Sequence, residues 1–155
     1  MAIKEGVAET LQRISKIHSH KQRIDTLRSD HSIPMEILVD CCFNPNIKFL
    51  LPTGKPPYKA LPKESDAQNH MYSQIRRIGV FHNQGNYPDM KQMQRERQFI
   101  DFIEACDPDD AALIVSIKDK KMPYPNITER LFKDAWPTLA STWVLPKEVT
   151  IKENG

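Results

Sequence analysis

Glycine is scarce in this chain, with 5 residues among 155, and none of them belongs to a glycine-rich phosphate loop. The patterns G-x-x-x-x-G-K-[ST] and G-x-S-x-G are both absent. The first places backbone amides around a phosphate, and the second exposes a serine nucleophile. Their absence removes the sequence signals for P-loop nucleotide hydrolysis and for serine-dependent acyl transfer, and we expect no catalytic activity and no cofactor.

Cysteine is also rare, and two of the three cysteines, Cys41 and Cys42, are neighbours in sequence. This spacing gives neither a disulfide framework nor a C-x-x-C metal pair. His18 and His20 have no carboxylate or thiol nearby at ligand spacing, so we expect no metal site. We predict that the cysteines are buried free thiols, which is typical of a reducing compartment such as the cytoplasm.

Long apolar runs are missing, and the N-terminus has no apolar signal core, so we expect neither a membrane span nor a membrane partner. Charge of either sign is not in large excess, because 22 Lys and Arg face 20 Asp and Glu, which gives a net charge of +2. A nucleic-acid-binding face must therefore come from local clusters of charge.

Apolar side chains recur at three- and four-residue spacing, which predicts amphipathic helices. The expected inward positions are Val7, Leu11, Ile14, Ile17, Ile24, Leu27, Ile37, Leu38, Cys41, Cys42, Met71, Ile75, Ile78, Met90, Met93, Ile100, Ile103, Ile127, Leu131 and Ala135. About seven helices and no convincing strand pair follow from this pattern, with one of the helices starting near residue 89.

Capping residues predict where several of these helices begin. Ser19 and Ser32 precede apolar periodic segments, and Pro34 follows Ser32 in a first turn. Asp107 is followed by Pro108 and by two further acids, which suit the positive end of a helix dipole. The sequence 126–129, Asn-Ile-Thr-Glu, resembles a capping box led by Asn126.

Prolines concentrate at positions 43–66, where Pro45, Pro52, Pro56, Pro57 and Pro62 predict a long ordered loop or an exposed arm. The last residues, 144–155, are polar, although Val149–Ile151 could dock onto the domain. We therefore predict a single all-α domain over residues 1–143 and a polar C-terminal tail over 144–155.

Two basic segments are candidates for binding phosphate. The first runs from Arg13 to Arg28 and contains Lys16, Lys21 and Arg23 against a single acid, Asp25. Cations in the first turn of a helix oppose its dipole, and a nearby anion would offset that cost. The alternative interpretation is a solvated charged face.

The second basic segment, residues 118–130, places three lysines before a capped helix, with Lys133 one turn further on. Its candidate DNA-binding residues are Lys118, Lys120, Lys121, Thr128, Arg130 and Lys133. The alternative is a basic helix end that complements its own dipole. The remaining helical cations, Arg76, Arg77, Lys91, Arg95 and Arg97, are interpreted as solvated faces.

Several short pieces of the chain occur in a characteristic order. They are Ile14, Ile17, Ser19, Lys21, Gln22 and Leu27, then Phe99–Ala105, Asp109, Asp110, Lys118, Asp119, Trp136, Pro137 and Leu139–Ser141. In this order they resemble the N-terminal DNA-binding domain of phage-type ATP-dependent DNA ligases. The resemblance spans roughly residues 8–142 and is gapped in the middle. Residues 49–58 and 117–120 also resemble those of small proteins from T4-like tailed phages.

The chain departs from the ligase pattern in two ways. It lacks the Lys-x-Asp-Gly motif of nucleotidyl transfer and is too short to include catalytic domains. Residues 122–125, Met-Pro-Tyr-Pro, stand where ligase domains usually have a glycine close to DNA. Prolines lack amide donors, so we expect charge contacts of Lys120 and Lys121 with DNA to replace the missing backbone amide contacts.

The resemblance implies a non-catalytic module that binds double-stranded DNA through phosphates and the minor groove with little sequence preference. Such a module would be a replication or repair accessory in the host-cell cytoplasm, with a phage or host replication protein as a further partner. The alternative is a protein-interaction adaptor for host takeover or anti-defence on the same scaffold, with Tyr58 of the Pro-rich arm as a docking residue.

Overall fold

The computed structural model describes residues 5–145, and the structural statements below refer to that part of the chain. It contains eight α-helices and two 3-10 helices, and no strand occurs among these residues. The elements are α1 Val7–Ser15, α2 His20–Asp30, α3 Ile33–Phe43, η1 Lys63–Ser65, α4 Gln68–Gln74, η2 Ile75–Val80, α5 Gln92–Glu104, α6 Pro108–Lys118, α7 Glu129–Ala135 and α8 Pro137–Ala140. The all-α prediction is confirmed. The segment Val149–Ile151, which could dock onto the domain, lies outside the described residues.

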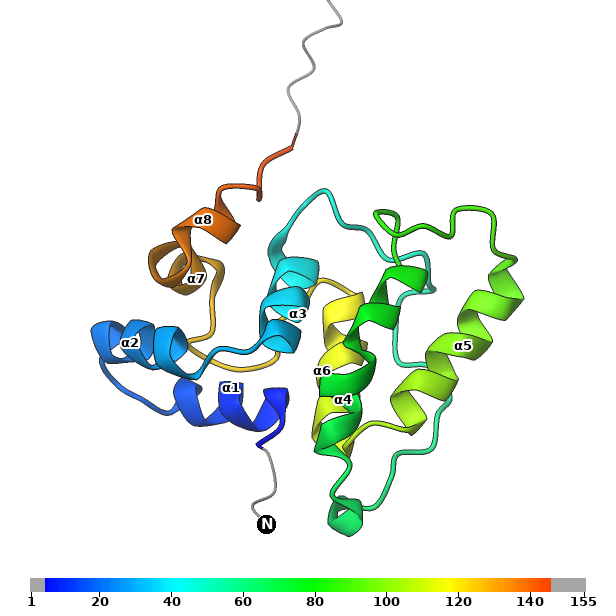
Figure 1. The fold of residues 1–155 in the computed structure, drawn as a ribbon, viewed down its shortest axis with the longest axis horizontal. Coiled ribbons are helices and arrows are strands. Elements are labelled where there is room, and N and C mark those ends of the chain that lie inside the picture. The colour runs from blue at the N-terminus through cyan, green and yellow to red at the C-terminus, as the bar shows by residue number, and fades with distance from the viewer. Residues whose placement is uncertain (1–4, 146–155) are drawn as a thin grey trace, which may run out of the picture.

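The helix α6 is the centre of the fold, since it packs against α1, α3 and α5 (Figure 1). Its side chains Ala111, Leu113, Ile114 and Ile117 are fully buried. These apolar residues point in several directions around the helix, which is typical of a helix covered by neighbours on most sides. The helices α2, α7 and α8 lie on one side of this centre, and α5 lies on the other.

Three predicted helix starts are confirmed by their capping bonds. Ser19 accepts a hydrogen bond from the Gln22 amide at the start of α2, and Ser32 accepts one from the Met35 amide at the start of α3, each at 3.3 Å. The Asp107 carboxylate accepts the Asp109 amide at 3.1 Å. Each side chain satisfies an N–H group that has no partner within its helix.

The predicted start of the last long helix was wrong by two residues. Thr128, and not Asn126, caps α7, because its side-chain oxygen accepts the Leu131 amide at 3.2 Å. Asn126 has a φ of 68° and donates from its side chain to the Ser15 carbonyl oxygen at 2.9 Å. Asn adopts this left-handed backbone conformation more readily than most residues, so Asn126 forms a turn that leads into the helix.

The inward face of α5 also differs from the prediction. The helix begins at Gln92 and not near residue 89, and the Met93 side chain is 82% exposed. Arg95, expected on a solvated face, is only 3% exposed. Its guanidinium donates to the carbonyl oxygens of Val80, Tyr87 and Met90 at 2.6, 3.0 and 3.3 Å. These bonds offset the cost of burying the charge and fix the loop before α5.

The Pro-rich segment is a strap held against the helices. Its attachments are hydrogen bonds from Lys118 Nζ to the Pro52 carbonyl oxygen (2.7 Å), from the Gly54 amide to Asp119 Oδ2 (3.0 Å) and from the Lys59 amide to Glu104 Oε2 (2.8 Å). Tyr58 is partly buried and packs against the core. The prediction of an ordered loop is therefore confirmed, and a docking role for Tyr58 stays a prediction.

Candidate nucleic-acid interface

The turn between α1 and α2 displays the first group of predicted cations. The Arg23 guanidinium donates to the carbonyl oxygens of Ile17 and His18, so this residue shapes the turn from within. Lys16 and Lys21 are exposed, and neither forms an ion pair within residues 5–145. Two free ammonium groups therefore face solvent on either side of the turn.

The helix α7 packs against α2, although more than 100 residues separate them in sequence. His20 Nε2 lies 2.8 Å from Asp134 Oδ2. At the other end of α2, the Arg28 guanidinium donates to the carbonyl oxygens of Ala135 and Asp134 at 3.0 and 3.1 Å. A cation at these carbonyl groups complements the negative end of the α7 dipole.

The packing of α7 places the second group of cations beside the first. The bond from Asn126 to Ser15 joins the turn before α7 to the end of α1, immediately before Lys16. Arg130 and Lys133 project from α7, with Arg130 80% exposed in its side chain despite lying 3.3 Å from Asp134. Lys133 pairs with Glu129 at 3.1 Å. We call the exposed residues Lys16, Lys21, Arg130 and Lys133 the corner patch.

The electrostatics of the corner patch are moderately positive. Residues 15–30 and 126–136 together contain six Lys and Arg and four Asp and Glu, an excess of two positive charges. The hydrogen bond with His20 is the main cause of the lowered pKa of Asp134, which therefore stays ionised. The exposed pairs at Arg130 and Lys133 are weak, so both cations can turn toward a phosphate.

Lys118 and Lys120, also predicted to bind DNA, have internal contacts instead. The Lys118 side chain is 2% exposed and pairs with Asp119 at 2.6 Å in addition to its bond with Pro52. Lys120 Nζ donates to the carbonyl oxygens of Cys41, Asn44 and Ile47 at 2.6, 2.9 and 2.6 Å. All three N–H donors of that ammonium group are thus used at the C-terminal end of α3. We leave both lysines out of the candidate interface.

Lys121 and Thr128, also predicted to bind DNA, are exposed but do not belong to the corner patch. The Lys121 side chain is exposed, while its backbone pairs with Ser116. It lies beside an open hollow of about 400 Å³ that is also lined by Lys48 and Lys120. Thr128 is exposed at the start of α7, where its oxygen caps the helix. Within residues 5–145, no hydrogen bond or ion pair joins Lys121 to the corner patch.

The predicted core cysteines are confirmed. Cys41 and Cys42 are 1% and 3% exposed, and burial raises the pKa of each thiol to about 12. No three His, Cys, Asp or Glu side chains within residues 5–145 are placed to hold a metal ion together. Over the same residues, no helix is both long enough and apolar enough to cross a membrane.

Sequence reasoning missed the structural roles of two arginines. Arg28 joins α2 to α7, and Arg95 organises the loop before α5. For Arg95 a signal was present, because Arg95, Phe99, Phe102 and Ile103 follow the helical spacing of one buried face. For Arg28 no local signal was present, since its acceptors lie more than 100 residues further along the chain.

The fold and the candidate site define a small all-α domain with a moderately basic corner and a strap of prolines. The chain belongs to a family of unknown function, DUF6433, whose model matches residues 10–124. Comparisons with curated proteins and with solved structures gave no match.

Proposed function

We propose that this protein is a non-catalytic module that binds duplex DNA through phosphate contacts of the corner patch. The observation that supports the proposal is the placement of Arg130 and Lys133 beside the turn of Lys16 and Lys21. Lysine and arginine contacts to phosphates provide affinity without reading the base sequence. The resemblance to the ligase domain points to the same partner, in a replication or repair accessory of a T4-like phage.

A salt titration of binding to nicked, intact and single-stranded DNA tests the proposal. Each phosphate contact contributes roughly one unit to the slope of log affinity against log salt. We expect Lys21→Glu combined with Arg130→Glu to lower both the affinity and this slope, by a similar amount for unrelated sequences. Lys63→Glu, on η1 and exposed, is the matched control and should have little effect.

Two results would contradict the proposal. One is a folded double variant that binds DNA as tightly as the wild-type protein, which would remove the corner patch from the interface. The other is a wild-type protein that binds none of the three DNAs at low salt. Circular dichroism of each variant separates a lost contact from a lost fold.

A protein-interaction adaptor is the second candidate function, and one observation favours it. Ile33, at the start of α3, is 58% exposed and lines an open hollow of about 590 Å³. Exposed apolar groups around a hollow are typical of contacts between proteins. If the wild-type protein binds no DNA while Ile33→Ser abolishes binding of a different protein, from host or phage, the adaptor is the better proposal.

A further inference from the structure

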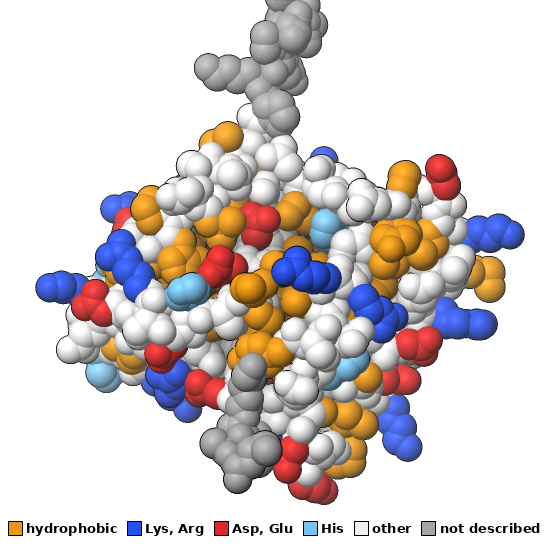
Figure 2. All heavy atoms as spheres, in the orientation of Figure 1, with side chains coloured by type: hydrophobic (Ala, Val, Ile, Leu, Met, Phe, Trp, Pro, Cys, Tyr) orange, Lys and Arg blue, Asp and Glu red, His pale blue; other side chains and the backbone are white. Residues whose placement is uncertain are grey.

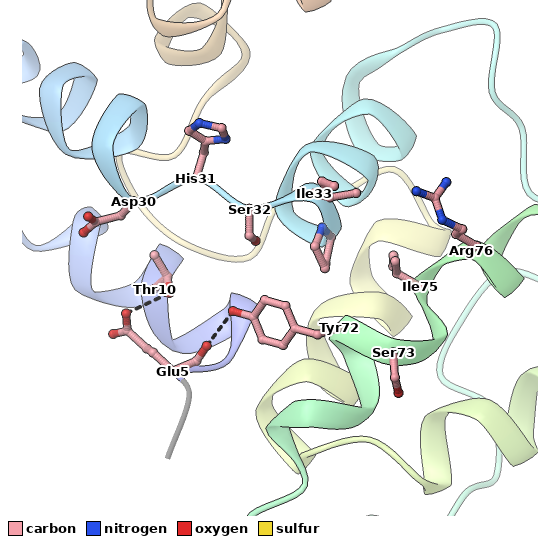
Figure 3. Close-up of a pocket in the computed structure, with 11 residues that line it drawn as sticks. Glu5, Thr10, Asp30, His31, Ser32, Ile33, Tyr72, Ser73, Ile75 and Arg76 are labelled. Carbon is pink, nitrogen blue, oxygen red and sulfur yellow. Dashed lines mark hydrogen bonds between the residues drawn. The ribbon is translucent and has the colours of Figure 1, made fainter. Parts of the chain in front are cut away.

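The hollow beside Ile33 lies between the α1–α2 side of the fold and the helices α4 and η2 (Figure 3). Pro34, Tyr72 and Ile75 contribute apolar surface to it. In the space-filling view, hydrophobic side chains are visible in the hollowed middle of this face, with charged side chains around them (Figure 2). Ile33 is thus an exposed apolar side chain immediately next to a partly apolar hollow.

Charges of opposite sign occupy opposite sides of this hollow. Asp30 and Glu5 lie on one side, and Arg76 lies on the other, with Ser32 and Ile33 between them (Figure 3). Among residues 5–145, the two carboxylates share a single cation, Arg13, which lies 2.8 Å from Asp30 and 3.0 Å from Glu5. One negative charge on that side is therefore not neutralised by the pairing.

The opposite side of the hollow has an excess of positive charge. Arg76 and its neighbour Arg77 are exposed, and neither pairs with an acid among residues 5–145. Arg77 instead lies over the Phe102 ring at 5.8 Å. Arg76 has no hydrogen bond or ion pair within the described part of the chain, so its guanidinium is available to a carboxylate of another molecule.

This order of groups is self-complementary. If two copies of the chain faced each other across a two-fold axis between Ser32 and Ile33, Ile33 of each copy would lie in the hollow of the other. The same rotation would place Arg76 of each copy against Asp30 of the other, because the two residues lie on opposite sides of the axis. A face that pairs with itself in this way forms an isologous dimer interface.

We infer that this face binds a second copy of the chain, with Arg76 of each copy paired with Asp30 of the other and Ile33 inserted into the partner's hollow. The inference is independent of DNA binding, since the corner patch does not line this hollow. Burial of Ile33 would supply affinity, and the two charge pairs would fix the orientation.

Sedimentation equilibrium of the full chain with paired charge reversals tests the inference. We expect Arg76→Glu alone and Asp30→Arg alone each to weaken dimerisation at least about tenfold, because each homodimer then contains two like-charge contacts. An equimolar mixture of the two variants should form a heterodimer, since both contacts then join opposite charges again. Dimerisation of this mixture at wild-type strength is the decisive positive result.

Matched controls and a third variant complete the design. Arg97→Glu on α5 and Met93→Ser, an exposed apolar residue away from the hollow, should leave dimerisation unchanged. Ile33→Ser should weaken it without loss of helical circular dichroism, since the side chain is mostly exposed. A wild-type chain that stays monomeric at about 0.5 mM would overturn the inference. So would a dimer that both charge reversals leave intact, or variants that dissociate singly and fail to pair when mixed.

Discussion

The carboxylate of Asp110 in α6 accepts a hydrogen bond from the Ala8 amide in the first turn of α1, at 2.8 Å and with both groups buried. The bond joins the N-terminal ends of two helices that are 102 positions apart in sequence. Among residues 5–145, Oδ2 of Asp110 has no hydrogen-bond partner, and neither does the buried Oε1 of Gln68. Both atoms lie near Gly6, where an added Cβ would be 3.1 Å from Oδ2 and 3.2 Å from Gln68 Cγ.

This environment predicts a pH-dependent stability. Burial raises the pKa of Asp110 to about 7, the Ala8 bond opposes the rise, and the neighbouring acids Asp107, Glu9 and Asp109 add to it. The unfolded carboxyl titrates near 4, so between about pH 4 and 7 only the folded chain holds the proton. Proton binding by Asp110 therefore adds its full contribution to the free energy of unfolding below about pH 4. This contribution is lost as the pH rises to about 7.

We expect Asp110→Asn to remove this dependence. The variant should be more stable than the wild-type protein above pH 7, on the order of 2–4 kcal/mol, and the two should converge toward pH 4. Urea unfolding at several pH values measures the difference, with Asp109→Asn as the partly exposed neighbouring control. A variant that is less stable than wild type at pH 8 would disprove this account.

Replacement of Lys120 should destabilise the fold. Lys120→Met leaves three carbonyl oxygens at the end of α3 without their donor, and we expect a loss of about 2–4 kcal/mol in the free energy of unfolding. Lys121→Met, at the exposed adjacent position, should change it by less than about 0.5 kcal/mol. Equal effects of the two changes would show that the Lys120 bonds contribute little.

The backbone at Lys120 permits a second comparison. Its φ of 63° is a left-handed conformation that glycine adopts without strain. Lys120→Gly should therefore be more stable than Lys120→Met by about 1 kcal/mol, because both lack the ammonium group and only one retains a Cβ. Thermal unfolding of the two variants provides the measurement.

Arg95 should tolerate neither lysine nor methionine. A lysine keeps the charge but lacks the planar fork that reaches the carbonyl oxygens of Val80, Tyr87 and Met90. We expect Arg95→Lys to cost about 1–3 kcal/mol and Arg95→Met more, measured by chemical unfolding. Hydrogen exchange should locate the loss in residues 80–91, and Arg97→Met, two residues further along α5 and exposed, serves as the control.

The three thiols should be unreactive in the folded protein. Cys41, Cys42 and Cys106 are buried, and burial raises the pKa of each thiol. Because the thiolate is the reacting form, alkylation at pH 8 should be slow under native conditions and complete in urea. Fast labelling of one cysteine without denaturant would place it outside the core.

Most of the helices could be predicted because their signals are local. Ser19, Ser32 and Asp107 cap their helices with side chains two or three positions before the amides that they satisfy. The start of α7 was misplaced because Asn126 and Thr128 both suit a helix start in sequence, whereas in the structure Thr128 caps the helix and Asn126 bonds to Ser15. That contact joins residues 111 positions apart, beyond the reach of local sequence patterns.

The candidate site was less predictable for the same physical reason. Lys118, Lys120 and Lys121 look equivalent in sequence, yet their side chains differ in what they bind. Lys118 pairs with Asp119 and the strap, and Lys120 donates to carbonyl oxygens of α3 and its following turn. The Lys121 side chain has no hydrogen bond or ion pair among residues 5–145. A lysine side chain extends far enough to reach distant backbone, so its environment depends on the tertiary fold. The corner patch itself depends on the docking of α7 against α2.

The return of α7 to α2 has a practical consequence for anyone who shortens this chain. A fragment trimmed to residues 10–124, where the family model matches, would omit Leu131 and Phe132, both fully buried in the intact domain. It would also omit the Ala8 amide that satisfies Asp110. Such a fragment would leave apolar surface of α2 and α3 uncovered, and exposed surface of this kind promotes aggregation. The smallest stably folded unit should therefore extend through Trp143, whose indole N–H donates to Asp40 and closes the end of α3.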